Sequence, residues 1–97
     1  MELSIIIPVY NSEKILTELI DQIKKEVESF SKKFEVILVN DFSHDDSWKI
    51  IKNLSNKYNF IKGIDLKKNY GQHNAIVAGL NFSSGDYMIL MDDDLQH

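Results

Sequence analysis

The segment LSIIIPV at residues 3–9 decides the fold, because it is a short and nearly continuous apolar run. Three further runs of this kind follow at residues 34–39, 60–66 and 87–91. Short apolar runs without polar alternation are typical of strands that are buried on both faces, as in parallel sheets. We therefore expect four parallel strands at these positions.

Segments with helical spacing of apolar residues lie between these runs. Apolar residues recur every three or four positions from Ile15 to Phe30, and a shorter stripe of the same kind runs from Trp48 to Tyr58. The small residues within Gln72–Phe82 indicate a third helix that packs closely on the sheet. The order β-α-β-α-β-α-β predicts an α/β fold with a mainly parallel sheet and helices on its faces.

Polar residues precede the first two of these helical segments. We expect Asn11 or Ser12 to cap the first helix, because their side chains can accept a hydrogen bond from a free backbone N–H. The candidates for capping the second helix are Asp45, Asp46 and Ser47, of which Asp45 is favoured.

The composition is that of one small globular domain: 97 residues, 43% of them hydrophobic and 27% charged. A net charge of −4 argues against a domain whose main work is to bind nucleic acid. The absence of Cys excludes disulfides, thiolate zinc sites and Cys nucleophiles. No apolar run approaches the ~20 residues of a membrane helix, and the start lacks the basic opening of a signal peptide. A cytoplasmic location is therefore the default expectation.

The acidic run Asp92-Asp93-Asp94 is the sharpest candidate for chemistry, because it follows the last predicted strand directly. Ligands of open α/β sheets bind beyond the carboxyl ends of the strands. In an extended backbone Asp92 and Asp94 point to the same side, and a divalent cation such as Mg²⁺ or Mn²⁺ would relieve their repulsion. Gln96 can add an amide oxygen. The alternative interpretation is an acidic turn that faces water.

Other polar residues follow the remaining strands. Asp41 can accept a hydrogen bond from a ribose hydroxyl or a base N–H, although a turn residue that caps the next helix would look the same. Lys67 and Lys68 can neutralise a diphosphate, or can simply be solvated, and Tyr10 can stack on a base. Neither a glycine-rich dinucleotide fingerprint nor a P-loop motif is present in the sequence.

Four motifs in the expected order resemble family 2 glycosyltransferases with the GT-A fold. They are SIIIPVYN at 4–11, ILVNDFS at 37–43, KNYGQ at 68–72, and GD at 85–86 together with MDDDLQH at 91–97. The NYGQ and DLQ pieces are similar to the branch that includes dolichol-phosphate mannosyltransferase and bacterial polyprenyl-phosphate glycosyltransferases. The resemblance implies a Rossmann-like GT-A nucleotide-diphospho-sugar transferase fold over the whole chain.

The resemblance also implies a function and a set of site residues. It implies inverting transfer of a sugar from a UDP- or GDP-sugar to a polyprenyl phosphate or a cell-surface glycan, with Mg²⁺ or Mn²⁺ as cofactor. The implied donor-binding residues are Pro8, Tyr10, Asp41, Lys68, Asp92 and Asp93, and the implied metal ligands are Asp92, Asp94 and Gln96. Neither the sugar nor the base of the nucleotide follows from these motifs.

The family's acceptor half and catalytic base lie beyond the motif at 92–94. We therefore expect residues 1–97 to be the N-terminal nucleotide-sugar-binding part of a larger GT-A domain, truncated after the strand that carries the motif and inactive alone. The full-length protein is expected at the cytoplasmic face of the membrane. Two residues depart from the family pattern: Phe42 replaces a small residue, so the loop is expected to bend differently, and Asn40 replaces a second Asp.

Two other classes of protein remain open from the residues alone. One is a non-catalytic module that binds a nucleotide or a divalent metal. The other is a receiver-like signalling domain, against which the absence of any Lys after Lys68 counts. The last strand is also expected to present an unpaired edge, which predicts self-association of the chain.

Overall fold

All four predicted strands form, and they join into one parallel sheet. The computed structural model describes residues 2–29, 33–68 and 71–92. The strands are β1 (Glu2–Val9), β2 (Lys33–Asp41), β3 (Ile61–Leu66) and β4 (Tyr87–Leu90). Their order in the sheet is β3-β2-β1-β4, and every neighbouring pair is parallel. The predicted α/β fold with a parallel sheet is confirmed.

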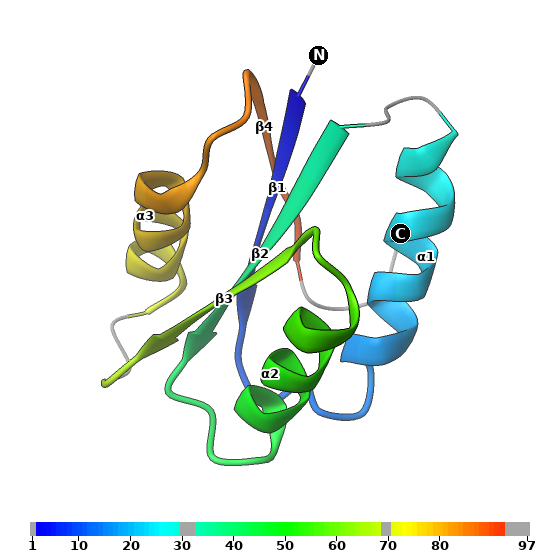
Figure 1. Cartoon of the computed structure of the whole chain (residues 1–97). Coiled ribbons are helices and arrows are strands. Elements are labelled where there is room, and N and C mark those ends of the chain that lie inside the picture. Colours follow the sequence, from blue (N-terminus) through cyan, green and yellow to red (C-terminus); the bar gives the residue numbers. More distant parts are fainter. Residues whose placement is uncertain (1, 30–32, 69–70, 93–97) are drawn as a thin grey trace.

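The three predicted helices also form, and they cover both faces of the sheet (Figure 1). They are α1 (Leu16–Glu28), α2 (Ser47–Lys57) and α3 (Gln72–Phe82). Helices α1 and α2 lie on one face, where they pack on a large core that includes Ile5 and Leu38. Helix α3 lies on the opposite face over a smaller core of Ile6, Ile37, Val39 and Ala75.

The prediction that α3 packs closely on the sheet is confirmed at Gly79. A Cβ atom added to Gly79 would collide with the side chain of Ile6 in β1 and crowd that of Val39 in β2. The absence of a side chain at this position therefore allows the α3 backbone to approach the centre of the sheet.

The predicted cap of α1 is wrong. The N-cap position is Ile15, which makes no side-chain capping bond, because the chain first forms a turn over residues 12–15. Ser12 contributes its backbone carbonyl instead, which accepts hydrogen bonds from the N–H groups of Ile15 and Leu16 at 3.1 and 3.2 Å. At the start of α2 the N-cap position is Asp46, but a carboxylate oxygen of Asp45 accepts the bond from the N–H of Ser47 at 2.9 Å.

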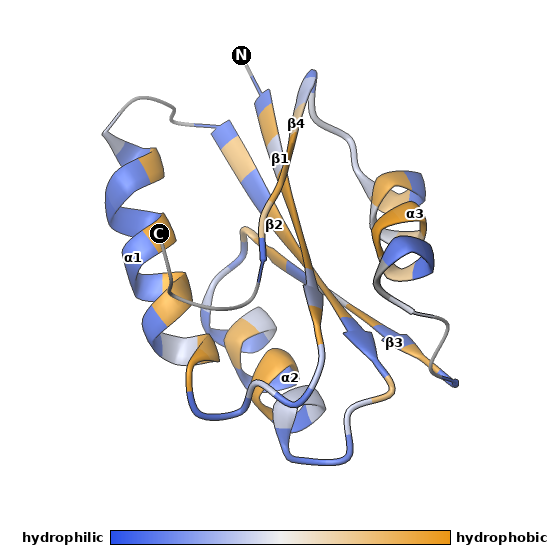
Figure 2. Cartoon of the chain, turned by 180° about the vertical axis from the view of Figure 1, so that it is seen from behind, coloured by the Kyte–Doolittle hydropathy of each residue, from blue (hydrophilic) through white to orange (hydrophobic). Residues whose placement is uncertain are grey.

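The expectation that every strand is buried on both faces holds for β1 and β2 and is wrong for β3 and β4, because only Ile61 of β3 is buried. Residues 3–9 of β1 are all buried, whereas the four residues of β4 are 40–60% exposed. Figure 2 shows the apolar strands at the centre of the sheet and the apolar stripe of α1 that faces them. Strand β4 is short and, among the described residues, pairs with β1 alone, so less of the protein covers it.

No helix within the described residues combines the length and the apolar character needed to cross a bilayer.

Candidate functional site

The carboxyl ends of the four strands meet at one edge of the sheet, where the sequence predicted a site. The chain runs outward from β1 through β2 to β3, and then returns to place β4 on the other side of β1. The helices change faces at the same point, with α1 and α2 on one side and α3 on the other (Figure 1). In open α/β sheets, ligands bind beyond the carboxyl ends of the strands at such a switch point.

The loops that follow β1 and β2 are joined by a reciprocal pair of hydrogen bonds. The N–H of Asn11 donates to the hydroxyl of Ser43 at 3.0 Å, and the N–H of His44 donates to the side-chain oxygen of Asn11 at 2.8 Å. Asn11 and Phe42 have φ values of 51° and 57°, in the left-handed region that favours glycine. Phe42 therefore holds a backbone conformation suited to the small residue that the family pattern led us to expect.

A second pair of hydrogen bonds, less exposed to solvent, also joins these two loops. The N–H of Ser12 donates to the hydroxyl of Ser47 at 2.8 Å, and the N–H of Glu13 donates to the carboxylate of Asp45 at 3.2 Å. Burial raises the pKa of Asp45, but the hydrogen bonds from Ser47 and Glu13 outweigh burial and hold that pKa below its ordinary value. The two loops therefore present one preorganised surface at the edge of the sheet.

Tyr10 and Asp41 come directly after the paired residues Val9 and Asn40 at this edge of the sheet. Val9 pairs with Asn40, so the next residues of the two strands are neighbours at the edge. Asp41 is 5% exposed, whereas Tyr10 is 45% exposed and meets the His44 ring edge-on, with the ring centroids 6.3 Å apart. An exposed aromatic ring beside a buried carboxylate can bind a planar base that carries N–H donors. Pro8, also predicted to bind the donor, is buried within β1 just before these residues.

A small cavity lies at the end of β3, next to this surface. Its volume is about 250 Å³, and its lining includes Asn40, Phe42, Asp65 and Lys67. The side-chain N–H of Asn40 donates to the carboxylate of Asp65 at 2.9 Å. An Asp at position 40 could not donate this bond and would repel Asp65, which accounts for the amide at this position. Lys67 and Lys68 follow the strand and are exposed.

The predicted metal-binding run begins where β4 ends. Leu90 pairs with Ile6, and the N–H of Met91 donates to the carbonyl of Ile6 at 3.0 Å. This register brings the exposed residue Asp92 to the same edge as the end of β1. Its carboxylate is a hard oxygen donor of the kind that Mg²⁺ and Mn²⁺ prefer.

The other members of this run, Asp93, Asp94 and Gln96, lie outside the described residues. Within residues 2–29, 33–68 and 71–92, no group of three or more His, Asp or Glu side chains is arranged to hold a metal ion. The predicted ligand set therefore stays a prediction.

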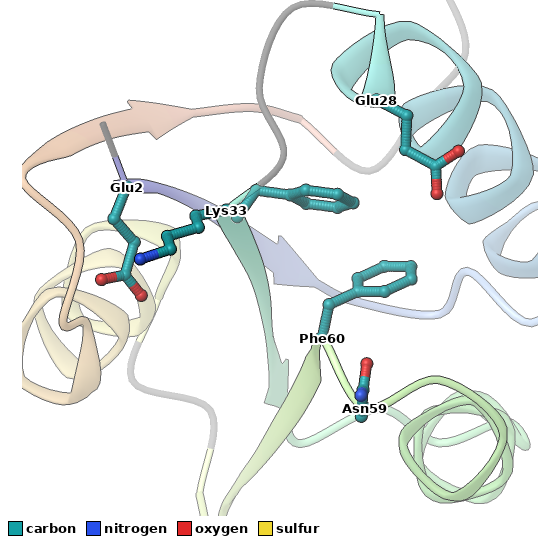
Figure 3. Close-up of a pocket in the computed structure, with 6 residues that line it drawn as sticks. Glu2, Glu28, Lys33, Asn59 and Phe60 are labelled. Carbon is teal, nitrogen blue, oxygen red and sulfur yellow. The ribbon is translucent and has the colours of Figure 1, made fainter.

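A pocket of about 560 Å³ lies at the opposite end of the sheet (Figure 3). It is lined by Glu2, Glu28, Lys33, Phe34, Asn59 and Phe60, near the amino ends of β1 and β2. The rings of Phe34 and Phe60 contact each other there at a tilt of 43°, with centroids 4.7 Å apart. None of the site residues predicted from the sequence lines this pocket, so we do not assign the site to it.

Sequence reasoning missed three residues that organise the sheet and its edge. They are Asn11 as a bridge between loops, Asp65 as the partner of Asn40, and Glu35, which is buried in β2. Glu35 was visible as a single acidic residue within an apolar run, which is the pattern of a buried carboxylate with partners, and Asp65 shares its run with Lys62. Nothing local to Asn11 indicated that it would reach Ser43 and His44.

An open parallel sheet with this strand order, and with helices on both faces that change sides at β1, defines a Rossmann-like α/β protein. Residues 4–97 match the family model described as glycosyl transferase family 2, and the chain belongs to this family.

Similar proteins agree with this assignment. The chain is 41% identical over 97 residues to an undecaprenyl-phosphate 4-deoxy-4-formamido-L-arabinose transferase of Proteus mirabilis, covering 99% of this chain and 30% of that protein. It is 43% identical over 95 residues to the protein of the same name from Shewanella sediminis, covering 97% of this chain and 29% of that protein. The chain thus spans about 30% of the length of these relatives.

Solved structures confirm the GT-A fold. The S. aureus TarS 1-349 structure in complex with UDP-GlcNAc has a TM-score of 0.83 and 35% identity, covering 97% of this chain and 27% of that chain. The mannosyltransferase PcManGT of Pyrobaculum calidifontis, in complex with GDP-Man and Mn²⁺, has a TM-score of 0.84 at 21% identity, covering 95% of this chain and 27% of that chain.

Proposed function

We propose that this chain is the donor-binding part of a glycosyltransferase that takes a sugar from a nucleotide-diphospho-sugar and transfers it to a polyprenyl phosphate. The observation that carries the proposal is that Tyr10 and Asp41 follow the paired residues Val9 and Asn40, at the same edge of the sheet as the strand end that precedes Asp92. Two findings support this choice of donor and acceptor. TarS, at 35% identity, was solved with UDP-GlcNAc, and both curated relatives are named as undecaprenyl-phosphate transferases.

The described side chains suit the nucleoside half of such a donor. Asp41 accepts a hydrogen bond from a base N–H or a ribose hydroxyl, and its burial strengthens that bond by excluding water. Tyr10 stacks on the base. Lys68 lies beyond the end of β3, where its ammonium group can neutralise the diphosphate.

The proposal gives the acidic run the role of holding a divalent cation on the diphosphate. Asp92, Asp94 and Gln96 offer oxygen donors that fit Mg²⁺ or Mn²⁺. When bound, such an ion acts as a Lewis acid that stabilises the departing nucleoside diphosphate. We further propose that transfer inverts the anomeric centre, because an acceptor that attacks from the face opposite to the leaving group gives inversion.

An acceptor of this kind is a membrane lipid, so the proposal includes a site of action at the cytoplasmic face of a membrane. We propose that residues 1–97 alone bind the donor without turning it over. A transfer assay that found metal-dependent turnover by the purified 97-residue chain would contradict this part of the proposal.

Titration calorimetry of the purified chain tests the binding function. We expect UDP or GDP to bind in the presence of Mn²⁺ and to bind much more weakly in EDTA. The variants Asp41→Asn and Asp92→Asn should each weaken binding by about tenfold or more. The control is Glu26→Gln, which removes a carboxylate from the exposed face of α1, far from the site.

The nucleotide that binds more tightly identifies the base of the donor. Mn²⁺ binding that is indifferent to both nucleotides would overturn the proposal in favour of a metal-binding module. Nucleotide binding that is unchanged in Asp41→Asn would overturn the role given to that carboxylate.

A further inference from the structure

Strand β4 leads directly into the acidic run, yet apolar packing contributes little to fixing the position of the strand. All four of its residues are between 40 and 60% exposed. Strands with weakly buried faces are prone to slip in register, and a slip of one residue turns every side chain to the other face of the sheet. It also displaces each residue by roughly 3.3 Å along the strand. Within the described residues, hydrophobic burial does little to fix where β4 ends.

A buried carboxylate lies at the start of β4. Glu35 belongs to β2, is 5% exposed, and lies opposite Ser4 of β1 on the face that α3 covers. One of its oxygens accepts hydrogen bonds from the hydroxyl of Ser4 at 2.5 Å and from the N–H and hydroxyl of Ser84 at 2.7 and 3.1 Å. The other oxygen pairs with the ammonium group of Lys62 in β3 at 2.6 Å.

The hydroxyl of Ser4 extends this network to the next residue of the chain. It accepts a hydrogen bond from the N–H of Gly85 at 2.8 Å, and the N–H of Asp86 donates to the carbonyl of Glu2 at 2.9 Å. The fit is tight, because a Cβ atom on Gly85 would lie 2.5 Å from the Ser4 hydroxyl oxygen and 2.8 Å from the Ser4 nitrogen. We call Ser4, Glu35, Ser84 and Gly85 the β4 clamp.

The clamp joins segments that are far apart in the sequence. Ser4 and Glu35 are 31 residues apart, Glu35 and Ser84 are 49 apart, and Ser4 and Gly85 are 81 apart. Burial raises the pKa of Glu35, but the hydrogen bonds from Lys62, Ser4 and Ser84 outweigh burial and lower the pKa to about 2. The carboxylate is therefore charged at neutral pH and accepts bonds on both oxygens.

We propose that Glu35 is a positioning residue for the donor site: through Ser84 and Ser4 it fixes the register of β4 against β1, and so sets where Asp92 lies. This inference rests on the proposed function for the role of the acidic run. Functional groups must be held within about 0.5 Å of their productive positions, whereas a register slip is several times larger. The clamp acts at the amino end of β4, so it reaches the site only through the strand.

Two matched variants separate positioning from general stability. Ser4→Ala removes the hydroxyl that bridges Glu35 and Gly85, and so loosens the β4 side of the network. Lys62→Met removes the ion pair on the β3 side and leaves the contacts to Ser84 and Gly85 in place. Glu35→Gln removes the negative charge that pairs with Lys62 and that accepts the hydrogen bonds from Ser4 and Ser84.

Hydrogen exchange of the β4 amides and titration of Mn²⁺ with UDP or GDP are the two readouts, both made well below the unfolding midpoint of each variant. We expect Ser4→Ala and Glu35→Gln to speed exchange in β4 and to weaken Mn²⁺-nucleotide binding by about tenfold. Lys62→Met should lower the unfolding midpoint and leave the affinity within about twofold of the wild type.

The outcomes distinguish this inference from the proposed function. If Ser4→Ala lowers the unfolding midpoint but changes neither β4 exchange nor affinity, the network is only structural and the inference is wrong. If the wild type binds no Mn²⁺-nucleotide, the proposed function fails, and exchange in β4 still decides whether the clamp fixes the strand. If Glu35→Gln does not fold, Ser4→Ala and Lys62→Met retain the comparison.

Discussion

Strands β1 and β4 are hydrogen-bonded neighbours of similar composition, yet they are stabilised in different ways. Ile5 pairs with Ile89, and Ile5 is 1% exposed whereas Ile89 is 40% exposed. β1 lies between two other strands with helices on both faces, so hydrophobic burial stabilises it. β4 is anchored instead by the polar bonds of the β4 clamp. Whether hydrophobic burial or polar hydrogen bonds hold each of these strands therefore depends on its position in the sheet, because both strands are rich in apolar residues.

The largest expected effect tests this contrast directly. Ile5→Ala should lower the free energy of unfolding by about 2–5 kcal/mol, because it leaves a cavity in the core. Ile89→Ala, at the partner position, should cost about 1 kcal/mol or less, because much of its side chain already contacts water. Chemical denaturation of the wild type and the two variants measures both changes in the free energy of unfolding. Equal losses would mean that β4 is as well buried as β1.

The next effect is the pH dependence that Glu35 confers. Its pKa is lowered from 4.5 in the unfolded chain to about 2 in the folded protein. The stabilisation is therefore fully present above about pH 4.5 and is lost as the pH falls towards 2. We expect a loss on the order of 2 kcal/mol, allowing for solvent screening of the half-exposed Lys62 partner.

The matched measurement is the stability of wild type and Glu35→Gln between pH 6 and pH 2. The difference between the two proteins should shrink as the pH falls, because only the wild type has this carboxyl group to protonate. A difference that stays constant over the whole range would show that the charge of Glu35 is not linked to folding.

The smallest expected effect concerns the edge of β4. Among the described residues β4 pairs only with β1, and its apolar side chains are half exposed, so we expect weak self-association of the chain. Ile89→Lys should abolish this association and leave the fold intact, since a lysine on an edge strand opposes pairing with another chain. Sedimentation velocity over a wide range of concentrations measures it, and a wild type that is monomeric throughout would contradict the prediction.

Much of the fold could be predicted because its signals are local. The apolar runs at residues 3–9 and 34–39 lie within β1 and β2, and the range predicted for the third helix matches α3. The caps were harder, because the turn before α1 moves the helix start to Ile15, and Ser12 contributes its carbonyl rather than its hydroxyl.

The candidate site could be predicted only in part. That Tyr10, Asp41 and Asp92 share one edge follows from the rule that parallel strands end together, and the structure brings them there. The bond from Asn40 to Asp65 and the bridge from Asn11 to Ser43 were not predicted, because they depend on how loops of different strands approach each other.

The amino-acid sequence alone determined the alternation of strands and helices, the buried character of β1 and β2, and the motifs of the glycosyl transferase family 2. These depend on the period of apolar residues and on residue types within short segments. Only the tertiary structure decided that β4 lies beside β1 and that Glu35 binds Ser4, Ser84 and Lys62. The physical reason is that such contacts join residues tens of positions apart, so no local pattern specifies which partner each residue will meet.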